Sequence, residues 1–198
     1  MSRINLRGYD NSWYYPGRSV LVRSLWLFAG QPLLRSPWFA ASAWRVALLR
    51  CFGARVGERV VIRQHVTVKY PWHLVIGSDC WIGERVWLDN LATISLADNV
   101  CLSQGAYLCT GNHDWTDEGF GLRVEPVVLG SGSWVGAQAM LLPGVILGEG
   151  AVAAAGSVVA GSVLSWQIVA GNPATFLKMR VIRERTRQTD EAVQEVTS

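Results

Sequence analysis

The sequence has few charged residues, and this shortage excludes two classes of protein. Only 17% of its 198 residues are charged, whereas 50% are hydrophobic. Such a chain has too much apolar surface to bury to remain disordered. The net charge of +3 is too small to indicate a nucleic-acid-binding protein. At this length we expect one main domain.

Cysteine is also scarce, and the few cysteines lack the spacing of a functional cluster. They form no CxxC pair of a metal or redox site and are too sparse for a secreted disulfide scaffold. The polar and aromatic start of the chain lacks the apolar core and cleavage site of a signal peptide. We therefore expect a cytoplasmic protein with four reduced thiols, namely Cys51, Cys80, Cys101 and Cys109.

No apolar run is long enough to cross a membrane. Residues 19–51 are rich in Leu, Trp and Phe, but they are interrupted by Arg23, Arg35 and Arg45 and by the prolines Pro32 and Pro37. A spanning helix needs about 20 nearly unbroken apolar residues. We expect the N-terminal segment, residues 1–55, to form two apolar helical pieces split around these prolines. They either pack on the protein body or a neighbouring subunit, or attach peripherally to the inner face of the membrane.

A six-residue repeat dominates the rest of the sequence. Aliphatic residues recur at intervals of six and are often followed by glycine, in four runs separated by small shifts of register. The runs are Val56, Ile62 and Val68; Ile76, Ile82, Leu88 and Ile94; Leu96, Leu102 and Leu108; and Leu129, Val135, Leu141, Leu147, Ala153 and Val159. A small or β-branched residue commonly lies four positions further on.

This period fits neither a single strand nor a helix, whose side chains repeat about every 2.0 and 3.6 residues. It fits short strands joined by tight corners, with the aliphatic side chains pointing into a narrow shared core. No repeat buries its apolar face alone, so the repeats must stack into a solenoid. The fold class is therefore all-β, a parallel β-helix over residues 56–173. Residues 174–198 are expected to form a short basic helix and a tail.

The repeats resemble those of the hexapeptide-repeat acyltransferases, in the stretches IGSDCWIGERVWLDN, LGSGSWVGAQAMLLPGVILGEGAVAAAGSVV and VAGNPA. Within that family, NSWYYPGRS, LLRCFGARVG, KYPW and SQGAYLCTGNHDW resemble the colanic acid biosynthesis acetyltransferases of exopolysaccharide clusters. The resemblance covers nearly the whole chain. It implies a left-handed coil, an exception to the usual crossover hand, and a homotrimer with active sites between subunits.

The repeat breaks off after Leu108 and resumes at Leu129, so a loop, expected at residues 114–126, leaves the coil directly after His113. Loops on a rigid scaffold are favoured places for functional sites. A neutral imidazole is suited to remove the proton of a hydroxyl that attacks a thioester. From the residues alone, His113 could equally be structural. The resemblance implies that it is the catalytic base.

The resemblance also implies candidate acceptor ligands. Asp89 and Asn90 match the place where the coils of the family approach the acceptor, and Asp114 follows the histidine. Glu84 stands where better-known sugar acetyltransferases have Asn, which leaves the acceptor open. The group that orients His113 also stays open, between a loop carboxylate and a backbone carbonyl.

For the donor, the resemblance implies that backbone groups in residues 133–161 contact the pantetheine arm of acetyl-CoA, with Ala137 stabilising the oxyanion. The basic residues after GNPA are candidates for the nucleotide phosphates, because the Thr-Lys that many relatives use is Ala160-Gly161 here. The predicted donor ligands are Trp134, Gly136, Ala137, Ala155, Lys178, Arg180 and Arg183.

The break in the repeat and, above all, the resemblance imply an O-acetyltransferase that moves acetyl from acetyl-CoA to a sugar hydroxyl, on a lipid-linked saccharide of exopolysaccharide (colanic-acid-like) biosynthesis. The alternatives are an N-acetyl or other acyltransferase acting on an amino sugar or small molecule, and an inactive trimeric scaffold. No metal is expected, since His65, His73 and His113 lack the spacing of the zinc ligands in β-helical carbonic anhydrases.

Overall fold

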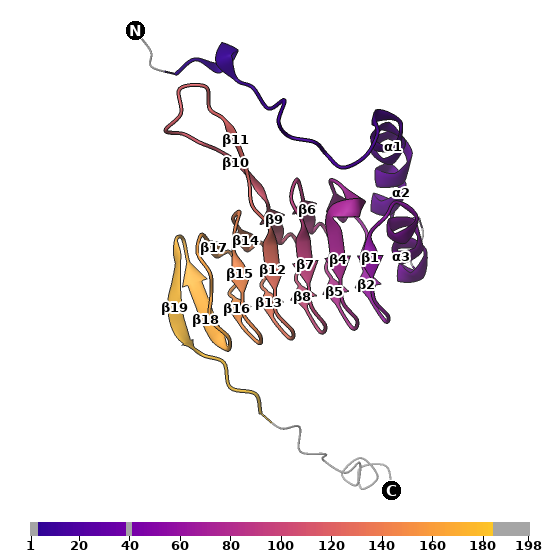
Figure 1. Cartoon of the computed structure of the whole chain (residues 1–198). Helices are drawn as coiled ribbons and strands as arrows, with labels where there is room; N and C mark the ends of the chain where they lie inside the picture. The colour runs from indigo at the N-terminus through magenta and orange to yellow at the C-terminus, as the bar shows by residue number, and fades with distance from the viewer. Residues whose placement is uncertain (1–3, 39–40, 184–198) are drawn as a thin grey trace, which may run out of the picture.

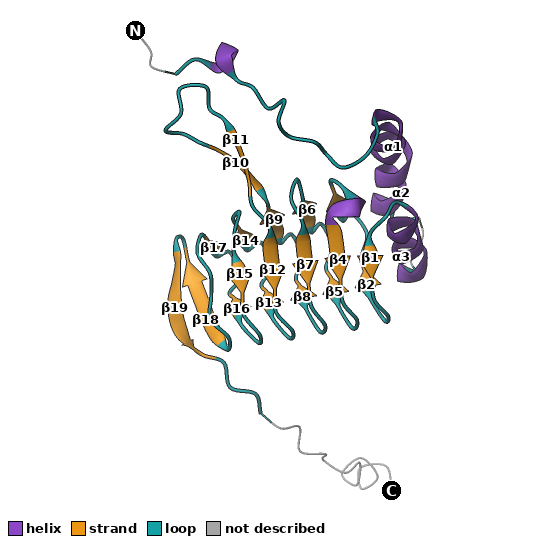
Figure 2. Cartoon of the chain, in the orientation of Figure 1, coloured by secondary structure: helices purple, strands orange, loops and turns teal. Residues whose placement is uncertain are grey.

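The chain forms a stack of short strands with a helical cap at one end (Figure 1). The computed structural model describes residues 4–38 and 41–183. Within that part, the α-helices lie together at the N-terminal end of the stack, and strands make up the body (Figure 2). The helices and helical turns are η1 (Leu6–Gly8), α1 (Val20–Leu25), the π-helical η2 (Trp26–Gly30), α2 (Gln31–Arg35), α3 (Ser42–Cys51) and η3 (Pro71–His73).

The strands of the stack form three faces. Face A consists of β1 (Arg55–Val56), β4 (Leu74–Ile76), β7 (Ile94–Leu96), β12 (Val127–Leu129) and β15 (Ile146–Leu147). Face B consists of β2 (Val61–Ile62), β5 (Trp81–Ile82), β8 (Cys101–Leu102), β13 (Trp134–Val135), β16 (Val152–Ala153), β18 (Gln167–Gly171) and β19 (Ala174–Met179). Face C consists of β3 (Thr67–Val68), β6 (Trp87–Asp89), β9 (Tyr107–Cys109), β14 (Met140–Leu141) and β17 (Val158–Val159). The chain visits A, B and C in turn, and neighbouring coils pair in parallel.

The aliphatic residues of the repeat fill the interior, as the sequence predicts. Ile76 pairs in register with Leu96 on face A, and Ile82 with Leu102 on face B. All four are at most 3% exposed. Burial of each such side chain contributes about 1.5 to 3 kcal/mol. The predicted fold class, a parallel β-helix of hexapeptide repeats with a helical N-terminal segment, is confirmed.

The register shifts of the sequence all fall on one edge of the stack. Paired residues on face A are 20 positions apart in the first coils, as in Val56 and Ile76, but 18 apart in Leu129 and Leu147. The extra residues lie between face C and face A, in the segments 69–73, 90–93 and 110–126. We call this edge the C–A corner. It also carries the long excursion that contains His113.

The helical cap packs its apolar side on the first coils. The indole Nε1 of Trp26 donates to the carbonyl of Val68 at 2.9 Å, and Leu34 and Leu49 are at most 1% exposed. The helical run passes through Pro32 and ends at Arg35, so the predicted split at Pro32 is wrong. Pro32 lies just after the π-helical turn η2, and a π-bulge of this kind is a place where a helix absorbs an interruption of its hydrogen-bond ladder.

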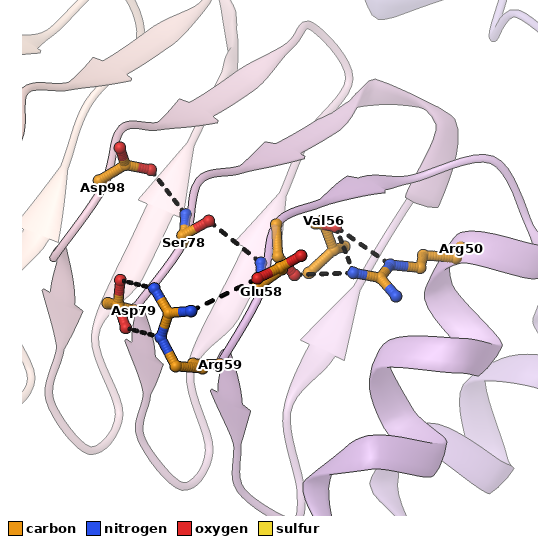
Figure 3. A network of polar contacts seen from close by, with 8 residues as sticks. Arg50, Val56, Glu58, Arg59, Ser78, Asp79 and Asp98 are labelled. Carbon is orange, nitrogen blue, oxygen red and sulfur yellow. Dashed lines mark hydrogen bonds and ion pairs between the residues drawn. The ribbon is translucent and has the colours of Figure 1, made fainter.

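A polar network joins the cap to the corner between faces A and B (Figure 3). The Arg50 guanidinium of α3 donates to the carbonyls of Val56 and Gly57, which belong to the edge strand β1 and its corner. In the next coils, Arg59 binds the Asp79 carboxylate through two nitrogens at 2.6 and 2.7 Å. Arg50 therefore satisfies carbonyl groups at an exposed sheet edge, where strands of another chain could otherwise pair.

The excursion from the C–A corner is a β-hairpin rather than an irregular loop. β10 (Gly111–His113) pairs antiparallel with β11 (Leu122–Val124), and both project away from the stack in Figure 1. The excursion therefore starts before His113, and the predicted loop boundaries of 114–126 are too narrow. The strand pairing satisfies backbone groups that leave the coil.

The C-terminal prediction is wrong for the described residues. Ala174–Met179 forms the strand β19, which pairs antiparallel with β18, and residues 180–183 are not helical. The turn at Gly171–Pro173 reverses the chain, and pairing with the last coil of face B then favours the strand. Residues 184–198 of the predicted basic helix and tail lie outside the described residues. Among the helices that the structure describes, none is long and apolar enough to cross a membrane.

Candidate active site

His113 is held in a fixed orientation at the end of β10. Its ring Nδ1 lies 2.8 Å from the carbonyl oxygen of Phe120. Because a carbonyl only accepts, Nδ1 carries the proton and the neutral ring keeps Nε2 as an acceptor. The Phe120 ring stacks on the imidazole at a centroid distance of 4.8 Å and an angle of 17°. The orienting group is thus a backbone carbonyl, one of the two options left open by the sequence.

Phe120 adopts an unusual backbone conformation to do this. Its φ is +57°, in the left-handed region that non-glycine residues rarely occupy. Such conformations persist where the surrounding structure enforces them, often at functional sites. Here the amide of Phe120 donates to the Asp117 carbonyl at 3.0 Å, and the turn aims both its ring and its carbonyl at His113.

An N-terminal strap, residues 4–18, lies along the hairpin (Figure 1). The amide of Asn5 donates to the Glu118 carbonyl at 2.8 Å, and the ring of Tyr9 meets the imidazole of His113 edge-on at 5.6 Å. Further along, the Tyr14 hydroxyl donates to the Leu91 carbonyl at 2.8 Å. These contacts fix the strap on both the hairpin and the C–A corner.

Strap, hairpin and corner enclose the His113 cavity, of about 670 Å³. Its lining is Tyr9, Asn11, Ser12, Tyr14, Tyr15, Pro16, Arg23, Lys69, Tyr70, Leu91, His113 and Leu122. Burial raises the pKa of Tyr14. The nearby Tyr70 and Asp89 raise it further, whereas the charge of Arg23 opposes the rise. Tyr14 therefore stays a neutral donor. Aromatic faces with neutral hydroxyls and amides suit a sugar, whose own surface has apolar faces and hydroxyl edges.

A second cavity, of about 450 Å³, opens between the helical cap and face C. We call it the helix cavity, and its lining is Val20, Arg23, Ser24, Trp26, Leu27, Gln31, Thr67, Lys69, Tyr70, Trp87 and Asp89. It shares Arg23, Lys69 and Tyr70 with the His113 cavity. The two cavities are therefore adjacent along the C–A corner.

Of the predicted acceptor ligands, Asp89 lines a cavity whereas Asn90 is buried between coils. Asp89 lines the helix cavity, with Oδ1 2.9 Å from the Lys69 ammonium and Oδ2 accepting from the Tyr107 hydroxyl at 3.2 Å. Asn90 is fully buried, and its amide bonds both the N–H and the carbonyl of Tyr70. Asn90 is thus a structural link between coils and does not face an acceptor, which corrects its predicted placement.

Asp114 and Glu84 lie away from the His113 cavity. The Asp114 carboxylate accepts from the N–H and hydroxyl of Thr116 and from Arg123, and these bonds order the hairpin turn. Glu84 lines a different hollow on face B, beside Gln104. Neither residue is among those that surround His113 in this subunit.

The predicted donor ligands lie at another edge of the stack. Gly136, Ala137 and Ala155 occupy the corner that leads from face B to face C, and Trp134 is 44% exposed on face B. The Ala137 carbonyl accepts from Gly156 at 2.8 Å, whereas its N–H has no partner among the described residues. A Cβ at Gly136 would lie 2.5 Å from the Ala155 nitrogen, so close coil packing also requires this glycine.

The predicted phosphate ligands are only partly available. The Nη1 atom of Arg180 donates to the carbonyls of Gly132 and Gly150 at 2.8 and 3.0 Å, so this side chain links the last coils. Lys178 in β19 and Arg183 beyond it are exposed. Within residues 4–38 and 41–183, no group of three His, Cys, Asp or Glu side chains could hold a metal ion.

Sequence reasoning missed the strap residues and the two cations of the cavities. Tyr9, Tyr14 and Arg23 lie about 90 or more positions before His113 and follow no repeat. Lys69 and Tyr70 lie in a register shift of the C–A corner. The register shift itself could have indicated these residues, because the extra residues of successive coils lie on the same edge of the stack as the hairpin.

Comparison with known proteins agrees with this fold. A family model described as hexapeptide repeat of succinyl-transferase matches residues 126–160. Over 168 residues the chain is 36% identical to the colanic acid biosynthesis acetyltransferase WcaF of Escherichia coli K12, covering 85% of this chain and 92% of that protein. It is 27% identical to the galactoside O-acetyltransferase of the same organism, covering 71% and 68%.

Solved structures share the fold. A hexapeptide-repeat acetyltransferase of Vibrio cholerae, complexed with acetyl coenzyme A, matches with a TM-score of 0.75 at 23% identity, covering 92% of this chain and 100% of that one. A maltose O-acetyltransferase of Clostridium difficile 630 matches with a TM-score of 0.74 at 22% identity, covering 85% and 92%. With the identity to WcaF over most of both sequences, these findings make the chain a member of the hexapeptide-repeat acyltransferases, and an acetyltransferase.

Proposed function

We propose that this acetyltransferase moves acetyl from acetyl-CoA to a hydroxyl of a sugar in exopolysaccharide biosynthesis of the colanic acid type, with His113 as general base. The observation that carries the proposal is the Nδ1 bond of His113 to the Phe120 carbonyl. It leaves Nε2 as the proton acceptor beside an aromatic, hydroxyl-lined cavity. The likeness to WcaF and to the galactoside O-acetyltransferase supports a sugar acceptor.

The reaction needs no covalent enzyme intermediate. The acceptor oxygen attacks the thioester carbonyl carbon while Nε2 of His113 takes the hydroxyl proton. The new C–O bond gives a tetrahedral oxyanion, for which the unpartnered N–H of Ala137 is a suitable donor. Collapse breaks the C–S bond, and the thiolate of CoA takes the proton from the imidazolium. The products are the acetyl ester and CoA, and His113 is again neutral.

The proposed donor and acceptor groups meet only across subunits, so we propose that the working enzyme is a homotrimer. In one chain His113 lies at the C–A corner and Ala137 at the corner between faces B and C. The exposed indoles of Trp81 and Trp134 flank Cys101 in register on face B. Exposed apolar side chains gathered on a sheet face favour such an interface. Lys178 and Arg183, both exposed, are suited to the phosphates of CoA.

The helical cap supports a peripheral contact with the cytoplasmic face of a membrane. Leu21, Leu25 and Phe28 lie at helical spacing and are 78%, 55% and 77% exposed, and Trp38 is 90% exposed. Residues 11–57 contain six arginines and no acidic residue. An apolar stripe among cations fits an anionic lipid surface. A lipid-linked saccharide would then reach the site from the membrane.

The experiment that tests the function is analysis of the product by mass spectrometry. In parallel reactions, the full chain is incubated with acetyl-CoA and either a neutral sugar or the matching amino sugar. The proposal predicts an added acetyl group that mild alkali removes, as for an ester. An alkali-stable amide would establish the N-acetyltransferase alternative. If calorimetry detects no binding of acetyl-CoA, the remaining alternative is an inactive trimeric scaffold.

A further inference from the structure

Arg23 lies where the His113 cavity and the helix cavity adjoin, and none of the described residues neutralises its charge. It lines both cavities together with Lys69 and Tyr70. Its Nε atom is buried without a hydrogen-bond partner. The described residues place no carboxylate within ion-pair distance of Arg23.

The fully buried Arg45 has its donors satisfied within the protein, unlike the partly buried Arg23. The Arg45 side chain is 1% exposed and donates to the carbonyls of Leu34 and Ser36 at 3.1 and 2.8 Å, with longer bonds to Ala41 and Ile62. Leaving a buried donor unpaired costs about 1 to 3 kcal/mol. The contrast with Arg45 indicates that the Arg23 guanidinium serves something other than folding.

The charge around Arg23 favours an anion. Lys69 is the other cation shared by both cavities, and its ammonium lies 2.9 Å from Asp89. The one carboxylate of the shared region is therefore already paired. The lining of the His113 cavity itself contains no Asp or Glu. A negative group placed between the two cavities meets an unpaired guanidinium and a half-neutralised ammonium.

We propose that Arg23, assisted by Lys69, binds an anionic substituent of the acceptor sugar, a phosphate or a carboxylate. This inference rests on the proposed function, because it assumes that the His113 cavity holds the acceptor. A planar guanidinium recognises both anions through paired N–H donors. The helix cavity, which shares Arg23 with the His113 cavity, also has apolar lining from Val20, Trp26 and Leu27. It accommodates an aglycone attached through the anion.

Binding and kinetics of wild type and Arg23→Gln test the proposal, with Arg18→Gln as the matched control because Arg18 is exposed on the same segment and lines neither cavity. The probes are glucose 1-phosphate, glucuronate and glucose, measured by calorimetry with the full chain. Wild type should bind at least one charged probe about tenfold more tightly than glucose, as expected for a charge-assisted bond. Arg23→Gln should lose that preference, Arg23→Lys should keep part of it, and Arg18→Gln should keep all of it.

A further probe, a short-chain prenyl diphosphate glucose, distinguishes an anion of a lipid carrier from an anion of the sugar itself. Tighter binding than glucose 1-phosphate assigns the anion to a lipid carrier, and equal binding assigns it to the sugar itself. An unchanged preference in Arg23→Gln, or no preference for any charged probe in wild type, overturns the proposal. Acetylation by Arg23→Gln with the same preference for charged over neutral sugars as wild type overturns this inference alone. Tight binding of the charged probes with no acetyl transfer to any sugar contradicts the proposed function instead.

Discussion

The Nδ1 atom of His113 lies 2.8 Å from the carbonyl oxygen of Phe120, across a hairpin that leaves the β-helix at one corner. The same residue that accepts this bond also stacks its ring on the imidazole. Phe120 thus controls the protonation pattern of the base through its backbone and the angle of the ring through its side chain. Both roles depend on the left-handed backbone conformation at this position.

Phe120→Ala removes the stacking ring and keeps the carbonyl. We expect kcat to fall about tenfold, because a loosened imidazole spends less time in the reactive geometry. The KM for acetyl-CoA and the unfolding midpoint should not change. Trp115→Ala is the control, since Trp115 is 72% exposed in the same hairpin and does not line the cavity. A change in KM alone, or equal losses in both variants, would argue against a positioning role.

The helical cap should bind anionic vesicles. In flotation with phosphatidylglycerol-containing vesicles we expect wild type to move with the lipid, and Leu21→Ser/Phe28→Ser to stay behind. Both side chains are more than three-quarters exposed, so their replacement should disturb the fold little. Ile146→Ser/Leu164→Ser, exposed apolar positions elsewhere, should float like wild type. If wild type does not float, the membrane contact is excluded.

Arg45→Met should destabilise the protein by about 3 kcal/mol or more, because it leaves several buried carbonyls without donors. Urea unfolding followed by tryptophan fluorescence measures the loss. Arg55→Met is the control, because Arg55 is exposed and its side chain forms no ion pair with a described residue, and its change should stay within about 0.5 kcal/mol. Similar stability of both variants would show that the cap does not depend on this arginine.

The Asp114 carboxylate gives the hairpin a pH dependence of known sign. Hydrogen bonds from Thr116 hold the pKa of Asp114 below its usual range, with Arg123 lowering it further. The folded pKa is lower than the unfolded one, so these bonds stabilise the turn above the ordinary carboxyl pKa of about 3.9 and are lost as the pH falls through the folded value. Thr116→Ala should raise the pKa of Asp114 in an NMR titration. That of Asp10, lowered by Ser12, should not move, and an unmoved Asp114 would contradict the assignment.

The fold could be predicted because its information is local. The six-residue repeat indicates in each strand which side chain points inward. Ile82 and Leu102 are therefore identified as core residues without knowledge of distant contacts. The excursion at His113 was visible for the same reason, as a break in that repeat. Within register shifts the repeat gives no such guide. The resemblance made Asn90 a candidate acceptor ligand, yet Asn90 is fully buried and its side chain bonds Tyr70 of the preceding coil.

The rest of the site depends on contacts between distant segments. Tyr9 reaches the His113 cavity because the strap returns over the hairpin, and Arg23 reaches it from α1 in the helical cap. No periodic pattern marks these residues. The strand at Ala174–Met179 was missed because its basic residues suggested a solvated helix, whereas pairing with β18 decides its conformation. Such pairing depends on the last coil being present.

The most direct test of the account is the rate of acetyl transfer by His113→Ala. The general-base role predicts a loss in kcat of about 10² to 10⁴, with unchanged acetyl-CoA binding and an unchanged circular dichroism spectrum. The Nδ1 bond to Phe120 stabilises the hairpin turn, so the spectrum and the binding constant must be measured on the same preparation. A folded His113→Ala variant that binds acetyl-CoA and keeps more than about a tenth of the wild-type rate would contradict the central claim.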